Sequence, residues 1–147
     1  DPDIGVGQAP YGVAVTPDGN RAYVTNFNSD SVSVIDTRTR AILGQPILVG
    51  SSPFGLAITP DGKQVYVANR NSFTVSVIDT ATGQVVKTLT TGGGAHGVSA
   101  STDGAFVFVT NIADDTVSII DVGSQDVVKT LPVGDRPNGI VYGGAAR

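Results

Sequence analysis

Apolar and polar residues alternate along short stretches of this chain, and turn-forming residues separate the stretches. Val32-Ser33-Val34-Ile35 is one such stretch, and it ends at Asp36. Alternation with a period of two, in segments rich in Val, Ile, Tyr and Thr, is typical of half-buried β-strands. No stretch keeps the 3.6-residue period of an amphipathic helix for long. The pattern therefore predicts an all-β protein, with its first strands at about 12–16, 21–26, 31–36 and 41–48.

Three motifs recur in a fixed order, at offsets of 43 and then 42 residues. They are Thr16-Pro17-Asp18-Gly19, repeated at 59–62 and in altered form at 101–104; Tyr23-Val24-Thr25-Asn26, repeated at 66–69 and 108–111; and Val32-Ser33-Val34-Ile35-Asp36, repeated at 75–79 and 117–121. Four short strands in a repeat of ~40–45 residues are the signature of a β-propeller blade. The longer first offset arises near 44–49, around Pro46, and predicts an insertion in an outer strand.

The repeats divide the chain into expected blades at about 6–48, 49–90 and 91–132, with the start of a fourth repeat at 133–147. The expected fold class is all-β: three four-stranded antiparallel repeats plus one extra inner strand, forming a single, partial propeller domain over residues 1–147. The Asp-Gly pairs at 18–19, 61–62 and 103–104 are expected hairpin turns, because Gly adopts positive φ freely and Asp tolerates it.

The motif Tyr23-Val24-Thr25-Asn26, in this order with the other two, resembles the YVTN β-propeller repeat. The resemblance covers about 6–131 and restarts at Val133-Gly134, while Ala95-His96 and Thr102 depart from the pattern. Such repeats are similar to those of microbial surface-layer and other extracytoplasmic propellers, which implies an extracellular, cell-surface or periplasmic protein. Related propellers also occur in lactonases and in electron-transfer enzymes.

Composition narrows the classes of function. Charged residues make up 15% of the chain and the net charge is −4, with Lys and Arg scattered singly. Without a basic stripe, nucleic-acid binding is disfavoured. No apolar run approaches the ~18 residues of a membrane span. The absence of Cys excludes a disulfide framework and a thiolate metal site. Residues 1–7 do not look like a signal peptide, so a secreted form would have lost its signal or carry it outside this sequence.

One repeated position varies while its neighbour is constant. A Gly opens each inner strand, at 12, 55, 97 and 139, and is expected to allow close backbone approach at the crowded axis. The residue before it differs in every repeat, and we expect the four to face the mouth of the channel, either as a binding surface or as a plug: Tyr11, Phe54, His96 and Asn138. The links between strands two and three are expected on the same face, which adds Asn26, Asn69 and Asn111 to the predicted ligand-binding rim.

The remaining candidate chemistry is sparse. His96 is the only His, whereas a zinc site normally takes three or four protein ligands, so no metal, no catalytic residue and no cofactor is predicted. Asp36, Asp79 and Asp121 end each third strand and either form a carboxylate ring for calcium or accept backbone N–H bonds in the next turn, the second being favoured. The three Asn residues carry the same ambiguity between ligand contact and loop bracing.

Taken together, these features predict an extracytoplasmic binding or interaction scaffold that uses the rim of a propeller and has a protein or a carbohydrate as its ligand. The alternative is an enzyme: a lactonase-like hydrolase or a fragment of a cofactor-binding propeller. Three blades do not close a ring, since propellers have ~4–8. We therefore expect a homodimer that completes a six-bladed ring, or other blades of a longer parent chain.

Overall fold

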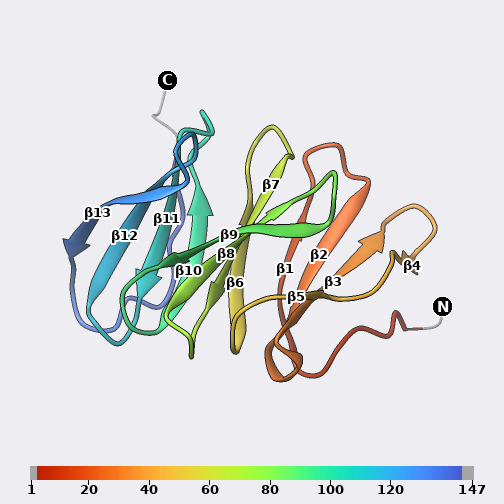
Figure 1. Ribbon diagram of the computed structural model, residues 1–147, viewed down its shortest axis with the longest axis horizontal. Coiled ribbons are helices and arrows are strands. Elements are labelled where there is room, and N and C mark those ends of the chain that lie inside the picture. Colours follow the sequence, from red (N-terminus) through yellow and green to blue (C-terminus); the bar gives the residue numbers. More distant parts are fainter. Residues whose placement is uncertain (1–2, 144–147) are drawn as a thin grey trace.

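The computed structural model describes residues 3–143 and contains three antiparallel sheets that stand side by side (Figure 1). Each sheet is one blade, with its strands in sequence order from inner to outer. Blade one comprises β1 Pro10–Val15, β2 Arg21–Asn26, β3 Ser31–Asp36, β4 Ala41–Ile42 and β5 Ile47–Leu48. Blade two comprises β6 Pro53–Ile58, β7 Gln64–Asn69, β8 Thr74–Asp79 and β9 Gln84–Thr90. Blade three comprises β10 Ala95–Ala100, β11 Phe106–Asn111, β12 Thr116–Asp121 and β13 Asp126–Pro132.

These sheets confirm the all-β fold class and the propeller blades expected from the sequence. A short 3-10 helix, η1 Phe27–Ser29, lies between β2 and β3. No helix among residues 3–143 is long and apolar enough to cross a membrane. The hairpin turns form where Asp-Gly pairs predicted them, with Gly19, Gly62 and Gly104 at φ of 74°, 73° and 73°.

The core lies between the blades and not at a central axis. Tyr23, Val32 and Val34 of blade one pack against Val65, Val67 and Ile78 of blade two. The opposite face of blade two packs on blade three through a second cluster, which includes Tyr66, Val77, Val107 and Ile120. Successive residues of a strand point to opposite faces of the sheet, and apolar residues at both kinds of position give a blade two apolar faces. Blade two, which stands between the other two, is therefore buried on both faces.

The outer strand of blade one is split, as the longer first offset predicted. β4 pairs with the end of β3 and β5 with its start. Between them Leu43 N–H still donates to Val34 O (2.8 Å), whereas residues 44–46 pair with neither part of β3. The outer strands β9 and β13 of the other two blades run for seven residues each. The insertion therefore opens blade one at its outer edge.

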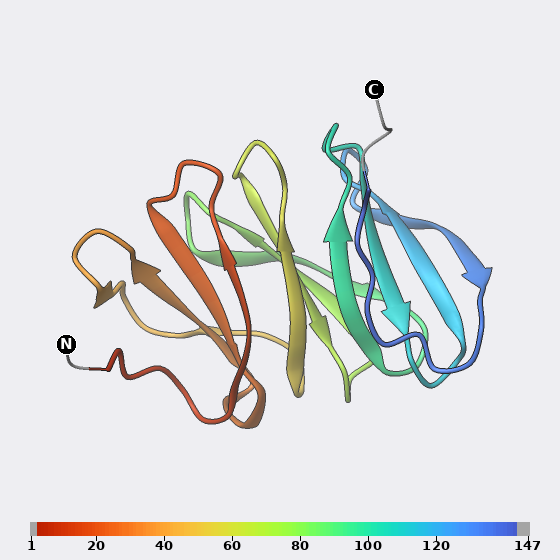
Figure 2. The same cartoon turned by 180° about the vertical axis from the view of Figure 1, so that it is seen from behind.

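Residues 133–143 do not form the extra inner strand that the fourth repeat predicted. They return alongside β10 (Figure 2). There Tyr142 N–H donates to Ser99 Oγ (2.9 Å), and the Tyr142 ring stacks on Phe108 with the ring centroids 5.9 Å apart. An inner strand is hydrogen-bonded to the second strand of its own blade, and residues 3–143 hold no such partner for this segment. The predicted repeat also extends over 144–147, which lie outside the described residues.

Candidate ligand-binding rim

The two sets of links expected on one face are bonded to each other through the backbone. Phe27 N–H donates to Ala9 O (2.9 Å) in blade one, Arg70 N–H to Ser52 O (3.1 Å) in blade two, and Ile112 N–H to Gly94 O (3.1 Å) in blade three. Each pair joins the link after strand two to the link that enters the inner strand. The structure therefore places both sets at the same end of the blades, where they form a common rim.

One residue of the rim in each blade has a left-handed backbone conformation, and in blades one and three its side chain anchors the adjacent link. Asp30 and Asp115 have φ of 48° and 55°, and their carboxylates accept the backbone N–H of Ser52 and Arg136, both at 2.7 Å. Blade two has Phe73 at this place, with φ of 58° and half of its side chain exposed. An exposed aromatic ring thus stands on the rim where the neighbouring blades have a bonded carboxylate.

The residues that vary before each inner-strand Gly meet in one row. The ring centroids of Tyr11 and Phe54 are 3.5 Å apart, and those of Phe54 and His96 are 3.8 Å apart. The row continues to Asn138, whose main-chain oxygen lies 2.7 Å from Nδ1 of His96. We call these four residues the rim row. It borders a cavity of about 310 Å³ along the inner strands.

Members of the rim row differ in accessibility. Tyr11 is 61% exposed, whereas Phe54 and His96 are 8% and 6% exposed. Asn138 is exposed and contributes its main-chain carbonyl to the row rather than the amide expected from the sequence. Of the three rings in the row, that of Tyr11 is therefore the one that a ligand can reach most directly.

The contact with Asn138 fixes the protonation of His96. A carbonyl oxygen only accepts hydrogen bonds, so Nδ1 carries the proton in the neutral ring and Nε2 keeps a free lone pair. Burial lowers the pKa of His96; the hydrogen bond to Asn138 opposes this, and the charge of Arg70 lowers the pKa further. The ring is therefore neutral at pH 7, a state in which Nε2 can accept a hydrogen bond from a ligand.

Two Arg residues stand beside the rim row. The guanidinium of Arg70 lies over the ring of Phe54, with Cζ 5.7 Å from its centroid. Arg70 and Arg136 border a second cavity, of about 470 Å³, together with Phe73 and Asp115. Neither guanidinium forms an ion pair within residues 3–143. This part of the rim combines two cationic groups with aromatic faces.

The three Asn residues of the predicted rim are fully buried. In each, Nδ2 donates to two hydroxyl groups of the following segment, as Asn26 does to Ser31 (3.2 Å) and Ser33 (3.0 Å). Asn26 Oδ1 also accepts Gly7 N–H at 3.0 Å, whereas Oδ1 of Asn69 and of Asn111 has no partner in the described chain. These contacts support the loop-bracing interpretation of the three Asn residues.

The Asp residues that end each third strand stabilise the turns that follow. Oδ1 of Asp36 accepts the N–H of Thr39 (2.6 Å), and Asp79 and Asp121 accept the N–H of Thr82 (2.7 Å) and Ser124 (2.8 Å) in the same way. These bonds hold the pKa of each carboxyl below its usual value. Within residues 3–143 no group of three or more metal-ligating side chains is present.

The constant Gly residues permit the close approach expected at the axis. A Cβ on Gly12 would lie 2.6 Å from the main-chain oxygen of Phe54, and a Cβ on Gly55 would collide with that of His96. The hydroxyl of Thr25 donates to this same Phe54 oxygen (2.8 Å) and accepts the N–H of Gly12 (2.8 Å). The spacing of adjacent inner strands, and hence of the rim row, is set by these contacts.

A family model described as YNCE-like β-propeller matches residues 44–146, more than half of the chain. The chain belongs to the YNCE-like β-propeller family. No curated protein matches it.

Several solved structures share this YNCE-like fold. A structure of Kuenenia stuttgartiensis hydrazine synthase is 29% identical, with a TM-score of 0.86, over 91% of this chain and 40% of that one. A functionally unknown protein from Desulfotomaculum acetoxidans is 22% identical (TM-score 0.75; 90% of this chain, 46% of that one). The structure of U3-55K is 18% identical (TM-score 0.81; 93% and 44%). The chain thus spans less than half the length of each, and the last two likenesses show the fold alone.

Sequence reasoning missed part of the rim of this YNCE-like propeller. Arg70, Arg136, Phe27 and Phe73 were not among the predicted site residues. The position after each buried Asn also varies between repeats, as Phe27, Arg70 and Ile112. That variation is the same kind of signal as the one that identified the rim row, and it would have pointed to Arg70.

Proposed function

We propose that this YNCE-like propeller is a binding module that recognises its ligand with the rim row and the adjacent Arg residues. One observation carries the proposal: four positions that vary between repeats, 42–43 residues apart, come together as a continuous stack bordered by Arg70. Ligand sites are typically concave and largely apolar, with a few convergent polar groups. The rim offers an exposed Tyr ring, a His acceptor nitrogen and two guanidinium groups that form no ion pair with residues 3–143, all at one end of the blades.

A protein or a carbohydrate suits this chemistry. Aromatic rings contribute large contact areas at low entropic cost, and Arg and Tyr are enriched among the residues that dominate interfaces. We place the protein outside the cytoplasm, at the cell surface or in the periplasm. The lack of oxidant-sensitive Cys, Met and Trp in all 147 residues supports this location.

The experiment that tests the binding module is a screen on glycan and peptide arrays with the labelled full chain. We expect saturable binding to one class of ligand, and we expect Tyr11→Ala and Arg70→Gln each to weaken it at least fivefold. Phe106→Ala is the matched control, because Phe106 is also an exposed aromatic residue but lies at the opposite end of blade three. Equal loss from Phe106→Ala would refute the rim as the binding face.

The end faces of the three-blade arc need partners in the complete protein. Val13 and Val15 on the first blade are 66% and 54% exposed, although the corresponding face of blade two is buried. We propose that further blades cover this face, supplied by a second copy in a six-bladed dimer or by a longer parent chain.

Light scattering of the chain should give about twice 14.9 kDa for the dimer. A stable monomer at micromolar concentration would leave the longer chain as the source of the blades.

An enzyme is the second candidate, and the 29% identity to a hydrazine synthase structure favours testing it. Assays with lactone and ester substrates, with and without divalent metals, distinguish the two functions. A hydrolase would turn over these substrates and lose activity in His96→Gln. A binding module shows no turnover while array binding persists.

A further inference from the structure

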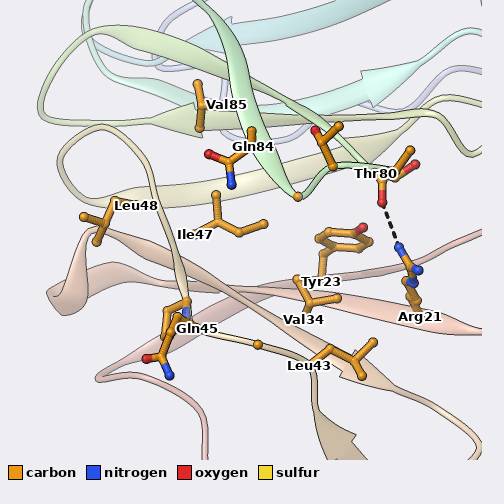
Figure 3. A pocket seen from close by; sticks show the side chains of 15 residues that line it. Arg21, Tyr23, Val34, Leu43, Gln45, Ile47, Leu48, Thr80, Gln84 and Val85 are labelled. Atoms are coloured by element: carbon orange, nitrogen blue, oxygen red, sulfur yellow. Dashed lines mark hydrogen bonds between the residues drawn. The ribbon is translucent and has the colours of Figure 1, made fainter.

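A groove of about 730 Å³ lies between blades one and two, at the outer edge and away from the rim (Figure 3). Its walls come from β2 and β3, from the loop that splits the outer strand of blade one, and from the turn between β8 and β9. We call it the outer groove. Its volume is within the ~300–1,000 Å³ range of small-molecule sites.

The split strand creates the outer groove. In blade two Lys87 pairs with Val77, and in blade three Lys129 pairs with Ile119, each from a continuous outer strand. In blade one β4 ends opposite Ile35 and β5 begins opposite Val32, so no strand residue lies opposite Val34, although Leu43 N–H donates to Val34 O (2.8 Å). After Leu43 the chain leaves the edge of β3 over residues 44–46, which line the groove.

The corresponding gap between blades two and three shows what fills such a place. The aliphatic chain of Lys87 extends across it, and Nζ reaches Asp126 Oδ1 (2.8 Å) and Ser124 O (3.3 Å) in the β12–β13 turn. An unbranched chain of four methylene groups with a polar head thus bridges this gap. In the outer groove the side chain that joins the two blades is that of Arg21, which reaches Thr80 O, and no Lys is among the residues that line the groove.

Tyr23 supplies a hydroxyl group to the outer groove. The side chain is 1% exposed and lines the groove, yet its hydroxyl makes no hydrogen bond within residues 3–143. Tyr66, at the same register of blade two, donates to Gln64 Oε1 at 2.9 Å. The Tyr23 oxygen is not one of the fully buried polar atoms that lack a partner in the described chain, so it faces the open cavity and can donate to a ligand there.

The charge of the outer groove is positive. Arg21 lines it and donates from Nη1 to Thr80 O (2.7 Å), which leaves further guanidinium N–H groups available. Its charge also acts on the nearby Asp18, which is not part of the groove. No Asp or Glu lines the groove, and Gln84 stands where the neighbouring turn has Asp126. We therefore expect a ligand of the outer groove to place an anionic head group at this turn, and not an ammonium group.

We propose that the outer groove binds a linear aliphatic carboxylate. Its head lies against Arg21 and the hydroxyl of Tyr23, which both donate to it, and its chain runs along Val34, Ile47 and Val85 (Figure 3). Arg and carboxylate form strong charge-assisted bonds, and the apolar wall removes the chain from water. The site is independent of the rim and of whatever the rim binds.

Two conservative substitutions test the head group, and each introduces a residue that another blade already carries at the same register. Arg21→Gln copies Gln64, and Tyr23→Phe copies Phe108. We expect saturable binding of one octanoate per chain by isothermal titration calorimetry. Arg21→Gln weakens it about tenfold or more and Tyr23→Phe at least threefold, as expected for hydrogen bonds to a charged group. Val34→Phe, which fills the groove, abolishes binding.

The controls separate the groove from general charge and apolar effects. Lys129→Gln removes an exposed cation from blade three, and Tyr66→Phe removes the equivalent hydroxyl from blade two; both retain wild-type affinity. 1-Octanol and octylammonium bind at least tenfold more weakly than octanoate. Octanol that binds as tightly as octanoate, an equal loss in Lys129→Gln, or no octanoate binding up to millimolar concentration would each overturn the proposal.

Discussion

The hydroxyl of Thr25, on the second strand of blade one, donates a hydrogen bond of 2.8 Å to the main-chain oxygen of Phe54, on the inner strand of blade two. The same oxygen atom of Thr25 accepts the N–H of Gly12 at 2.8 Å, so one buried hydroxyl joins an inner strand to its own blade and to the next. The Thr of the Tyr-Val-Thr-Asn motif therefore connects blades as well as strands.

Replacing this hydroxyl should destabilise the blade junction. Thr25→Val keeps the shape of the side chain but leaves the Gly12 N–H and the Phe54 carbonyl without this partner, at a cost of about 1–3 kcal/mol in the free energy of unfolding. Urea unfolding followed by circular dichroism measures the change. Thr130→Val, at an exposed position of β13, is the control and should change stability by less than about 0.5 kcal/mol.

Val67 is fully buried in the cluster between blades one and two. Val67→Asp places a carboxylate there without a cationic partner, and we expect a loss of about 3–5 kcal/mol. Val128→Asp makes the same change on β13, where the side chain is 54% exposed, and should be nearly neutral. Equal melting temperatures for the two variants would contradict the burial of Val67.

Acid should unfold the protein through its turn carboxylates. Hydrogen bonds from the Thr16 hydroxyl, the Asn20 N–H and the Asn20 side chain lower the pKa of Asp18 to about 2. Bonds from the Thr59 hydroxyl and from the Ser101 hydroxyl lower those of Asp61 and Asp103 in the same way. Because the unfolded chain then binds more protons than the folded one, the free energy of unfolding rises with pH in this range.

The stabilisation by these turns is therefore complete above about pH 4, and it is lost as the pH falls towards 2. Urea titrations between pH 7 and pH 2 test this, and Asp18→Asn should flatten the acid limb of the profile. The control is Asp135→Asn, because the Asp135 carboxylate forms no hydrogen bond or ion pair with the described residues. An acid limb that both substitutions alter equally would argue against the turns as its origin.

His96 should titrate below its usual pKa of ~6.5, because the ring is buried beside Arg70. The unfolded chain then takes up the proton first, so the free energy of unfolding rises as the pH increases from the folded-state pKa to about 6.5 and is constant above it. Nitrogen chemical shifts should identify Nδ1 as the protonated atom at pH 7.

Arg70→Gln tests the cause of that shift. Removal of the guanidinium charge should raise the pKa of His96 part of the way back, while the Nδ1 tautomer persists through the bond to Asn138. A His96 ring that titrates at or above 6.5 in the wild-type protein would contradict its burial in the rim row.

The sequence predicted the blades well because each one is a local unit. Motifs 42–43 residues apart located the strands, and the Asp-Gly pairs located the turns. The longer offset near Pro46 even predicted the interruption of an outer strand. The rim row was predicted as four equivalent positions, since equivalent positions of neighbouring blades must lie side by side.

Properties that depend on contacts between blades could not be predicted in the same way. The repeats do not reveal that Phe54 is buried between two other rings while Tyr11 is exposed, because within residues 3–143 no blade packs beside Tyr11 on its outer side. Nor do they reveal that the insertion leaves Tyr23 beside a cavity, since that depends on where the loop lies and not on its composition. Residues 133–143 carry the pattern of an inner strand but lack the second strand that would pair with them.

The stacking of Tyr142 on Phe108 makes the two ends of the three-blade arc unequal. Tyr142 is one repeat after Ala100, so it contacts blade three from the side on which the next blade of a propeller would stand. A partner that docks there has to displace this ring. A partner that docks on the other end contacts Val13 and Val15, which are already exposed to solvent. The two ends therefore offer different surfaces to a partner: a stacked aromatic pair on blade three and exposed Val side chains on blade one.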